Sequence, residues 1–410
     1  MPTEGPTQVL RSPLVLALLA LHALPALAES SPYYAGATLG LSHVSNVYRA
    51  AGAGDSDTVT SAGVLAGLDQ QLGRQRLTVD GSLQDNRYSS NSSLNNSSYS
   101  LRSGLDWQTV GRLSGTVSAS SSRSLADFNV GGGVNPIFAK NTERNDEYSA
   151  FARLGTSTRY TFEAGFTRRT RDFSAVEYAR LVYQQNTTSL GIYATPGANL
   201  RVGLVGRRTL GQNPSYPVGL TFNPSIPGLE IVYAPNDYRR NDIDLTLNWN
   251  TGGASTLNAR LSASRTRNSL NQLTNFSGTT GALGWTWQAL SKLQLSTQVT
   301  RDSGQETLVR SADVNRVYTN WQLGAVYAAT AKLSLNASVS SNRSTRANSD
   351  NSPLSDNYEK ARSQSLGLRW AYSRSFSLGC QYNHSSRDSS VPQYVYSANS
   401  LGCTGQALIY

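Results

Sequence analysis

The chain has very little methionine, cysteine and histidine: one, two and three residues among 410. Charged residues make up only 15% of the sequence, although the formal charge is +10. After the first thirty residues there is no long apolar run, which excludes a membrane-spanning helix in that part. No cysteine or histidine spacing typical of a metal site occurs, and there is no glycine-rich phosphate loop. The sequence therefore predicts neither a metal nor another cofactor.

A mean hydropathy of −0.37 is common among soluble proteins. It also suits a membrane barrel, because only alternate residues of a barrel strand face lipid. Residues 242–263 show such a pattern: apolar residues occupy every second position from 243 to 249 and again from 257 to 263. A glycine-rich turn at 251–254 separates the two arms. Each arm has about ten residues, which is the length that a tilted strand needs to cross a bilayer.

This hairpin pattern recurs along the chain, with short turns and long polar loops in alternation. The short turns fall near 72–73, 109–111, 155–156, 196–197, 252–253, 290–291, 330–331 and 373–374. An outer-membrane barrel has short periplasmic turns and long extracellular loops, whereas a soluble sandwich gives no reason for this alternation. A propeller would need four strands in each repeat of about forty residues, and two longer ones are present. The pattern predicts an all-β fold, a single transmembrane antiparallel β-barrel of about 18 strands.

The first 28 residues have the organisation of a cleavable signal peptide. Arg11 supplies a positive end, residues 14–21 form an apolar core, and residues 26–28 read Ala-Leu-Ala. The apolar run is too short to favour the alternative, an uncleaved anchor helix. We expect a signal peptide at 1–28 and an outer-membrane barrel over 29–410, surrounded by outer-membrane lipid.

The last residues resemble the sorting signal of outer-membrane barrels. Gly405, Leu408 and Tyr410 reproduce its glycine, alternate hydrophobic residues and terminal aromatic residue, with tyrosine where phenylalanine is usual. The resemblance implies that the barrel-assembly machinery recognises the C-terminal strand as a partner. It also implies that Leu408 and Tyr410 face lipid.

If the apolar strand faces meet lipid, the polar faces line the lumen. Strand parity then places twelve bases inside: Arg76, Arg102, Arg112, Arg153, Arg159, Arg169, Arg201, Arg207, Arg260, Lys292, Lys332 and Arg369. Six acids have the same parity: Asp80, Asp106, Glu147, Glu163, Asp242 and Asp244. This excess predicts an electropositive path for an anionic solute or polymer. The alternative is that these bases brace the wall in ion pairs or contact anionic headgroups.

Two loops contain more apolar residues and prolines than a solvated loop needs. The longer one, 209–238, contains five prolines and either folds into the lumen as a constriction or forms an external cap. The second carries a Gly-Gly-Gly run at 131–133 and Pro-Ile-Phe at 136–138. This loop is the second candidate for a constriction of the lumen.

Cys380 and Cys403 are the only cysteines, in a chain predicted to reach an oxidising compartment. A hairpin centred on the loop between them places the two opposite each other on the last two strands, within disulfide range. Because the parity of Cys403 conflicts with lipid-facing Leu408 and Tyr410, this pairing requires a bulge near Gly405. The alternative is two unpaired thiols that face lipid.

Catalysis and nucleic-acid binding are both disfavoured. His43 has lipid-facing parity and Ser45 follows it, as an outer-membrane lipid-modifying enzyme would require, but no acid, base and nucleophile can be assembled around them. A route through the periplasm takes the basic chain away from nucleic acid. The sequence therefore predicts a channel and not an enzyme.

The signal, the first strand and the sequence Ser-Asn-Val-Tyr-Arg at 45–49 resemble the EpsL-like family of β-barrel porins found with exopolysaccharide operons. In that family an aspartate is common where Ser45 stands. The resemblance implies an outer-membrane role in exopolysaccharide biosynthesis or export, with an anionic polysaccharide and periplasmic export proteins as partners. It brings no catalytic residues. A general or anion-selective diffusion porin with the same wall is the alternative function.

Overall fold

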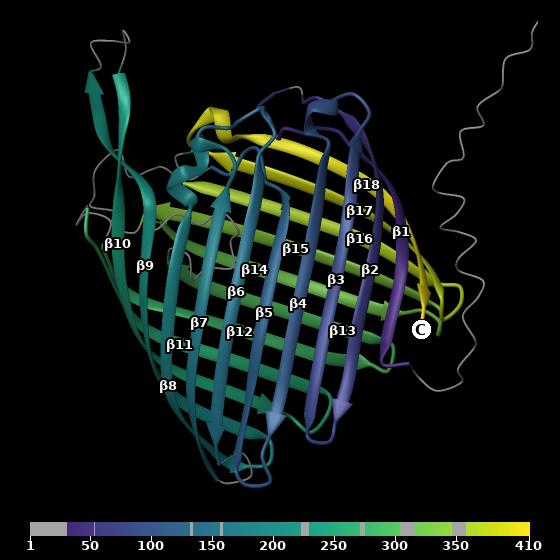
Figure 1. Cartoon of the computed structure of the whole chain (residues 1–410), viewed down its shortest axis with the longest axis vertical. Coiled ribbons are helices and arrows are strands. Elements are labelled where there is room, and N and C mark those ends of the chain that lie inside the picture. Colours follow the sequence, from purple (N-terminus) through teal and green to yellow (C-terminus); the bar gives the residue numbers. More distant parts are fainter. Residues whose placement is uncertain are drawn as a thin grey trace, which may run out of the picture.

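The computed structural model is a closed barrel of 18 antiparallel strands (Figure 1). It describes residues 31–52, 54–131, 134–155, 159–222, 229–270, 275–303, 316–346 and 358–410. Each strand pairs with its neighbours in sequence, and β1 also pairs with β18, from Ala35 opposite Ile409 to Val44 opposite Ser400. The predicted all-β barrel is confirmed, including its strand number. The expected signal peptide at 1–28 lies outside the described residues.

The strands follow one another, and the described connections between them contain three short 3-10 helices. The first nine are β1 (Tyr33–Val44), β2 (Asp57–Leu72), β3 (Gln75–Tyr88), β4 (Asn96–Gln108), β5 (Leu113–Leu125), β6 (Thr142–Leu154), β7 (Tyr160–Phe173), β8 (Tyr183–Gly197) and β9 (Leu200–Phe222). The others are β10 (Leu229–Asn250), β11 (Ser255–Asn268), β12 (Phe276–Leu290), β13 (Leu293–Ser303), β14 (Arg316–Ala328), β15 (Leu333–Arg346), β16 (Glu359–Ala371), β17 (Phe376–Ser389) and β18 (Tyr396–Ile409). The 3-10 helices are η2 (Ser92–Leu94), η3 (Val176–Leu181) and η7 (Pro392–Tyr394). No helix among the described residues is both long and apolar enough to cross a membrane.

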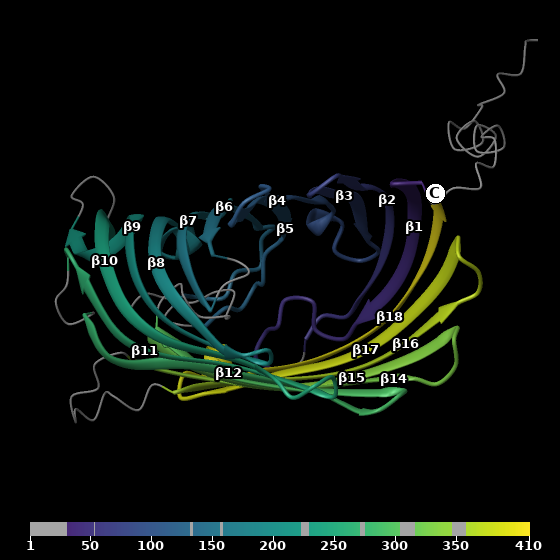
Figure 2. The same ribbon diagram turned by 90° about the horizontal axis from the view of Figure 1, so that it is seen from below.

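The alternation in sequence becomes two faces of the wall. On β1, Leu39 and Leu41 face outward and are 69% and 59% exposed, while Thr38 and Ser42 on either side of this pair face the lumen. The same alternation exposes Leu261 on β11 and Leu366 on β16. Because successive strand residues point to opposite faces, one apolar outer surface and one polar lumen follow from a period of two. Figure 2 shows the strands arranged around a flattened ring.

Short turns lie at one end of the barrel and long connections at the other. Residues 73–74 and 198–199 are two-residue turns, whereas residues 126–141 form a sixteen-residue connection between β5 and β6. Gly252 and Gly253 have φ values of +86° and +118°, which only glycine adopts easily, and this explains the glycine pair in the turn after β10. An even number of antiparallel strands places the start of β1 and the end of β18 at the short-turn end.

The expectation that residues 209–238 form a loop is wrong. Most of them extend β9 and β10 into a hairpin that projects past the rim (Figure 1), with Leu229 opposite Phe222. The neighbouring strands stop earlier, since β8 pairs with β9 only as far as Gln212. Prolines are tolerated here because a two-stranded ribbon has free edges, and two register shifts occur on β10 between Val232 and Asn236. The described part of this segment therefore projects away from the lumen as a ribbon.

The last two strands also correct an expectation. Cys380 lies opposite Cys403, and the two form a disulfide with a Cα–Cα distance of 4.0 Å. The register runs without a shift through Gly405 on both sides of β18, so the predicted bulge is wrong. Cys403 lies opposite outward-facing Leu41, which places the disulfide on the outer surface.

The predicted lipid-facing orientation of Leu408 is also wrong, because β18 has no register shift between Cys403 and Leu408. Leu408 lies opposite Gly36, on the lumen face, and its side chain approaches that glycine. Ala407 and Ile409 face outward instead. Every second residue from Cys403 to Ile409 therefore lies on the outer face. Tyr410 follows the strand, with its ring centroid 6.4 Å from that of Tyr34 on the lumen side. A terminal aromatic residue alone did not fix the parity of this strand.

The topology predicts which segments are reachable from outside a cell. An epitope tag inserted after Ser92, in the long-loop end, should be labelled by antibody on intact cells. A tag inserted after Gly252, in a short turn, should be labelled only after the outer membrane is permeabilised. Labelling of the Gly252 tag on intact cells, with a periplasmic marker protein still protected, would contradict this orientation.

Candidate functional site

The structure places the twelve predicted lumen bases in two groups. Eight lie on strands with inward parity: Arg76, Arg102, Arg153, Arg169, Arg201, Arg207, Arg260 and Arg369. The other four lie in or next to short turns and not on strands: Arg112, Arg159, Lys292 and Lys332. The strand assignment thus separates eight wall positions from four positions at the short-turn mouth, a distinction that sequence parity did not make.

A first group of wall charges surrounds Glu163 on β7. Arg153 on β6 lies 2.7 Å from the Glu163 carboxylate, and Arg201 on β9 lies 3.9 Å from it. The Tyr193 hydroxyl donates to Glu163 at 3.3 Å, while the Arg201 guanidinium stacks 3.8 Å from the centre of the Tyr193 ring. One acid thus orients two bases and an aromatic ring against the wall.

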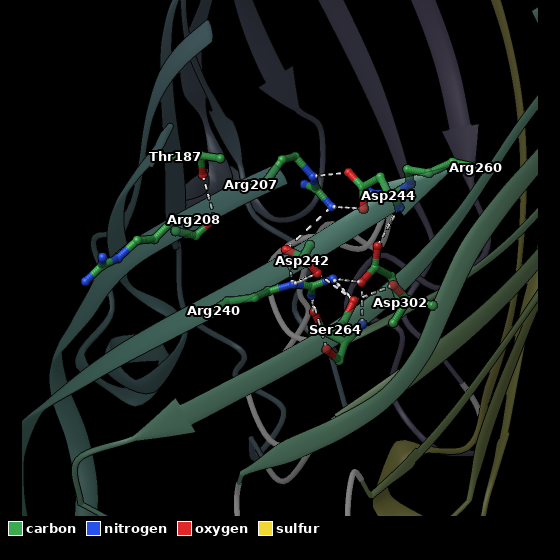
Figure 3. Close-up of polar contacts among 12 residues, drawn as sticks. Thr187, Arg207, Arg208, Arg240, Asp242, Asp244, Arg260, Ser264 and Asp302 are labelled. Carbon is green, nitrogen blue, oxygen red and sulfur yellow. Dashed lines mark hydrogen bonds and ion pairs between the residues drawn. The ribbon is translucent and has the colours of Figure 1, made fainter. Parts of the chain in front are cut away.

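A second group, the arginine–aspartate cluster, consists of Arg207, Arg240, Arg260, Asp242, Asp244 and Asp302 (Figure 3). Arg207 binds Asp244 at 2.5 Å, and Arg260 binds Asp302 at 2.8 Å. Arg240 joins the two halves because it contacts both Asp242 at 2.9 Å and Asp302 at 2.8 Å. The Arg240 side chain is 4% exposed, and those of Asp242 and Asp302 are 0% and 3% exposed. Three bases and three acids make the cluster neutral.

Six of the eight inward wall bases therefore contact an acid. Besides those above, Arg76 binds Asp69 at 2.6 Å and Arg169 binds Glu147 at 3.0 Å. Sequence reasoning missed both Asp69 and Asp302. Asp69 lies within β2, whose residues were not assigned to a face, and Asp302 is the last residue but one of β13. Arg102 lies opposite Asp80 in the strand register. The wall thus holds more acid than strand parity counted.

The short-turn mouth has a different charge. Its described turns and their flanks carry six bases: Arg74, Arg112, Arg159, Lys292, Lys332 and Arg374. No aspartate or glutamate lies among the described residues of these turns. Lys292 and Lys332 donate to carbonyl oxygens of neighbouring turns, those of Ala329 and Tyr372. Among the residues weighed for the lumen, the excess of bases over acids is therefore concentrated at this mouth.

The long connections at the other mouth pack into a loop cluster with its own apolar core. This core consists of Tyr48, Leu94, Ala126, Phe128, Val130, Val134, Ile137, Phe173, Tyr178 and Leu181. The residues come from four successive long connections and the adjoining strand ends, and Leu94 and Tyr178 are fully buried. Burial of this apolar surface gives the connections a fixed arrangement. Figure 2 shows the connection after β1, drawn in purple, within the outline of the ring.

Hydrogen bonds fasten the loop cluster across the mouth. The Asn129 amide donates to the Arg49 carbonyl at 2.9 Å and to the Gln393 carbonyl at 3.3 Å, although Gln393 belongs to the connection after β17. Arg387 on β17 donates to the Asn129 carbonyl at 3.0 Å. The Tyr178 hydroxyl donates to the Phe128 carbonyl at 2.8 Å, and burial raises the pKa of this hydroxyl, which therefore keeps its proton. Through Asn129, the 126–141 connection, named as the second candidate from sequence, contacts the connections after β1 and β17.

The segment 45–49 builds the base of this cluster. The Ser45 hydroxyl accepts from the Asn399 backbone N–H at 2.9 Å. Asn46 donates to the Ala50 carbonyl at 2.9 Å and accepts from the Ala50 N–H at 3.0 Å, which closes a turn. Tyr48 packs against Phe128, and Arg49 has a φ of +52° and forms an ion pair with Asp127. Ser45, Asn46 and Arg49 thus each form a contact that holds this part of the loop cluster in place.

A cavity of about 260 Å³ lies where the loop cluster meets the barrel wall. Asn46, Arg49 and Phe128 line it from the loops, and Ser385 and Ser400 line it from β17 and β18. Residues with amide, guanidinium and hydroxyl groups, and one with an aromatic ring, therefore line a space of small-molecule size.

The wall below this cavity is rich in uncharged polar side chains. One row of residues paired strand to strand runs through Gln298, Gln322, Ser340, Ser363 and Ser385. The adjacent row contains Ser338, Ser365, Asn383 and Ser400. We call these two rows the neutral sector. Hydroxyl and amide groups both donate and accept hydrogen bonds, so this sector can exchange partners with water or a polar solute.

His43 and Ser45, the two residues considered for catalysis, contact different partners. His43 Nδ1 contacts the Thr58 hydroxyl at 3.2 Å, and the Ser45 hydroxyl binds the Asn399 backbone. Within the described residues, no group of three or more histidine, cysteine, aspartate or glutamate side chains is placed to hold a metal ion.

No protein-family model matches the chain, and no curated protein matches it. The barrel is similar to the crystal structure of OccK5 (OpdH) of Pseudomonas aeruginosa, at 12% identity over 93% of this chain and 100% of that one, with a TM-score of 0.46. It is similar to OccK2 (OpdF) of the same organism in complex with glucuronate, at 11% identity over 92% and 98%, with a TM-score of 0.47. OmpT of Vibrio cholerae gives 11% identity over 93% and 99% and a TM-score of 0.36. Identities this low leave the function to be read from the residues of the barrel itself.

The arginine–aspartate cluster predicts a large loss of stability when one member is removed. Arg240→Met should lower the free energy of unfolding by about 3 kcal/mol, because it leaves Asp242 and Asp302 buried with fewer counter-charges. Arg208→Met, on the same sheet but facing outward, should change it by less than about 0.5 kcal/mol. Urea titration of both variants in phosphatidylcholine bilayers checks this, and equal losses would contradict the structural role of the cluster.

Proposed function

We propose that this barrel is an outer-membrane channel through which small polar solutes diffuse. The observation that carries the proposal is the closed wall of 18 strands with its apolar outer face and polar lumen. Strand number sets barrel diameter, and barrels of about sixteen to eighteen strands leave an aqueous channel. A closed sheet also satisfies every strand edge, as a bilayer requires. The outer membrane is the location that suits such a wall.

The charges of the two mouths and the wall predict how such a channel would select solutes. The wall pairs most of its bases with acids, whereas the short-turn mouth carries six bases and no acid among its described turn residues. A ring of bases raises the local concentration of anions and lowers that of cations. We expect the loop cluster at the other mouth to limit the size of the solute.

We expect the wild-type channel to prefer anions, with the preference set at the short-turn mouth. The triple change Arg112→Glu, Arg159→Glu and Lys332→Glu replaces three positive charges by three negative ones and should turn the preference toward cations. The reversal potential in a planar bilayer under a salt gradient measures this. Arg301→Glu, which is outward-facing and remote from that mouth, should leave the reversal potential within error of wild type. A cation-selective wild type would contradict the assignment, and a barrel that conducts no current at all would contradict the channel.

Export of an exopolysaccharide is a second candidate, and the neutral sector favours it. Sugar hydroxyls exchange hydrogen bonds readily with serine, asparagine and glutamine, which neither hold nor repel them strongly. The resemblance of residues 45–49 points the same way, although in the structure those residues build the loop cluster. Passage of a polymer would require the 126–141 connection to move aside.

Gene deletion separates the two candidates. Loss of an exporter should leave polysaccharide in the periplasm and none at the cell surface, with uptake of small anions unchanged. Loss of a diffusion channel should lower uptake of small anions and leave secreted polysaccharide at the wild-type amount. Quantifying both in one deletion strain, complemented with the intact gene as the control, decides between them.

A further inference from the structure

The outer surface carries a group of arginines that the channel proposal does not use. They follow the apolar band toward the long-loop end, at outward positions of β9, β10, β11, β13 and β15: Arg208, Arg239, Arg265, Arg267, Arg301 and Arg343. All six are exposed. We call them the outer arginine group.

Their orientation follows from strand parity. Arg208 is the neighbour of Arg207, which points into the lumen and binds Asp244. Figure 3 shows the Arg208 side chain directed away from that cluster. On β11, Arg265 and Arg267 continue the outward series that contains Leu261, which is 58% exposed. The outer group and the lumen bases thus lie on opposite faces of the same strands.

The two faces also differ in their partners. Arg207, Arg240 and Arg260 each contact an aspartate. Among the described residues, no acid forms an ion pair with any of the six outer arginines. Asp237, the outward acid closest along β10 to Arg239, instead accepts from Gln212 at 2.8 Å. These six charges therefore lack a counter-charge within the described part of the chain.

One cross-strand pair of arginines is destabilising because, within the described chain, no acid lies between its two charges. Arg239 lies directly opposite Arg267 in the register of β10 with β11. Like charges directly opposite on neighbouring strands are destabilising. Arg265 and Arg208 are both paired with Asn241, from the two sides of β10, which brings further positive charge to the same place. An external anion that binds between these guanidinium groups would remove the repulsion.

The height of the outer arginine group on the barrel wall indicates which anion binds there. Arg267 lies ten residues along β11 from Leu257, which is about 33 Å of strand and roughly 25 Å across a bilayer once tilt is included. The apolar band of an outer-membrane barrel is about 25 Å tall. The outer arginine group therefore lies at the level of the lipid headgroups, at the long-loop end. Guanidinium groups bind phosphate oxygens in pairs of parallel hydrogen bonds.

We infer that the outer arginine group is a binding site for the phosphate groups of the phosphorylated glycolipid that forms the outer leaflet of the outer membrane. Arg239, Arg265 and Arg267 form its centre. The site rests on the proposed outer-membrane location and is independent of whether the barrel conducts. It fixes the height and orientation of the barrel in the membrane by charge at one rim.

The test uses the full-length purified barrel in a nonionic detergent and bisphosphorylated lipid A as the probe, with binding measured by native mass spectrometry. The triple variant Arg239→Gln, Arg265→Gln and Arg267→Gln should bind roughly 100-fold more weakly than wild type, at about fivefold for each charge removed. Wild type should bind dephosphorylated lipid A as weakly as the triple variant binds the phosphorylated form.

The matched control changes two outward arginines at the same end that have their own acids. Arg87 lies 2.6 Å from Asp85, and Arg144 lies 3.0 Å from Asp146. Arg87→Gln with Arg144→Gln should leave lipid A binding within about twofold of wild type. Circular dichroism shows whether each variant keeps its strand content, so that loss of binding in an unfolded variant is not counted.

Three results would overturn the inference: equal weakening by the control variant, equal binding of dephosphorylated lipid A, or binding of phosphatidylglycerol as tight as that of lipid A. Cell fractionation tests the location separately. A barrel found outside the outer membrane would contradict the proposed function, whereas the binding measurements on purified protein would still decide whether this phosphate site exists.

Discussion

The pairing of β1 with β18 is the interaction on which the rest of the structure depends. A sheet of seventeen pairings with two open edges would leave a row of unpaired backbone donors and acceptors on each side, and lipid supplies no partner for them. Closure between Ala35–Ile409 and Val44–Ser400 removes both edges. It also divides every strand into an outer and an inner residue series, so the position of each charge follows from whether its residue number is odd or even within its strand.

Charge is distributed over this wall in three distinct ways. Inside, bases and acids are paired, as in the contact of Arg240 with both Asp242 and Asp302. At the short-turn mouth, bases occur without acids among the described turn residues. Outside, arginines such as Arg239 and Arg267 face each other without an acid. A formal charge of +10 for the whole chain describes none of these three regions. Selectivity of a solute and attachment to lipid depend on the separate regions.

Sequence periodicity was sufficient to predict the fold. A period of two, together with alternating short turns and long loops, is compatible with few closed arrangements of strands. It found the inward position of Arg207 and the register of Cys380 with Cys403. The predictions failed where they were based on composition or on a terminal residue and not on periodicity. Proline content made 209–238 look like a loop, although free ribbon edges accept proline, and a terminal aromatic residue misdirected the parity of Leu408. The contacts of Asn129 join connections that are 264 residues apart in sequence, and no local pattern indicates them.

The measurement that most directly tests the account is the accessibility of single spin labels along β11 in lipid vesicles. Labels at Leu257, Ala259 and Leu261 should be relaxed by oxygen, which concentrates in lipid, and protected from a water-soluble nickel complex. Labels at Asn258 and Arg260 should show the reverse. A period of two with this phase supports a lipid-facing outer surface and a water-filled lumen. Equal access of the nickel complex to both series would contradict the membrane barrel and, with it, the channel.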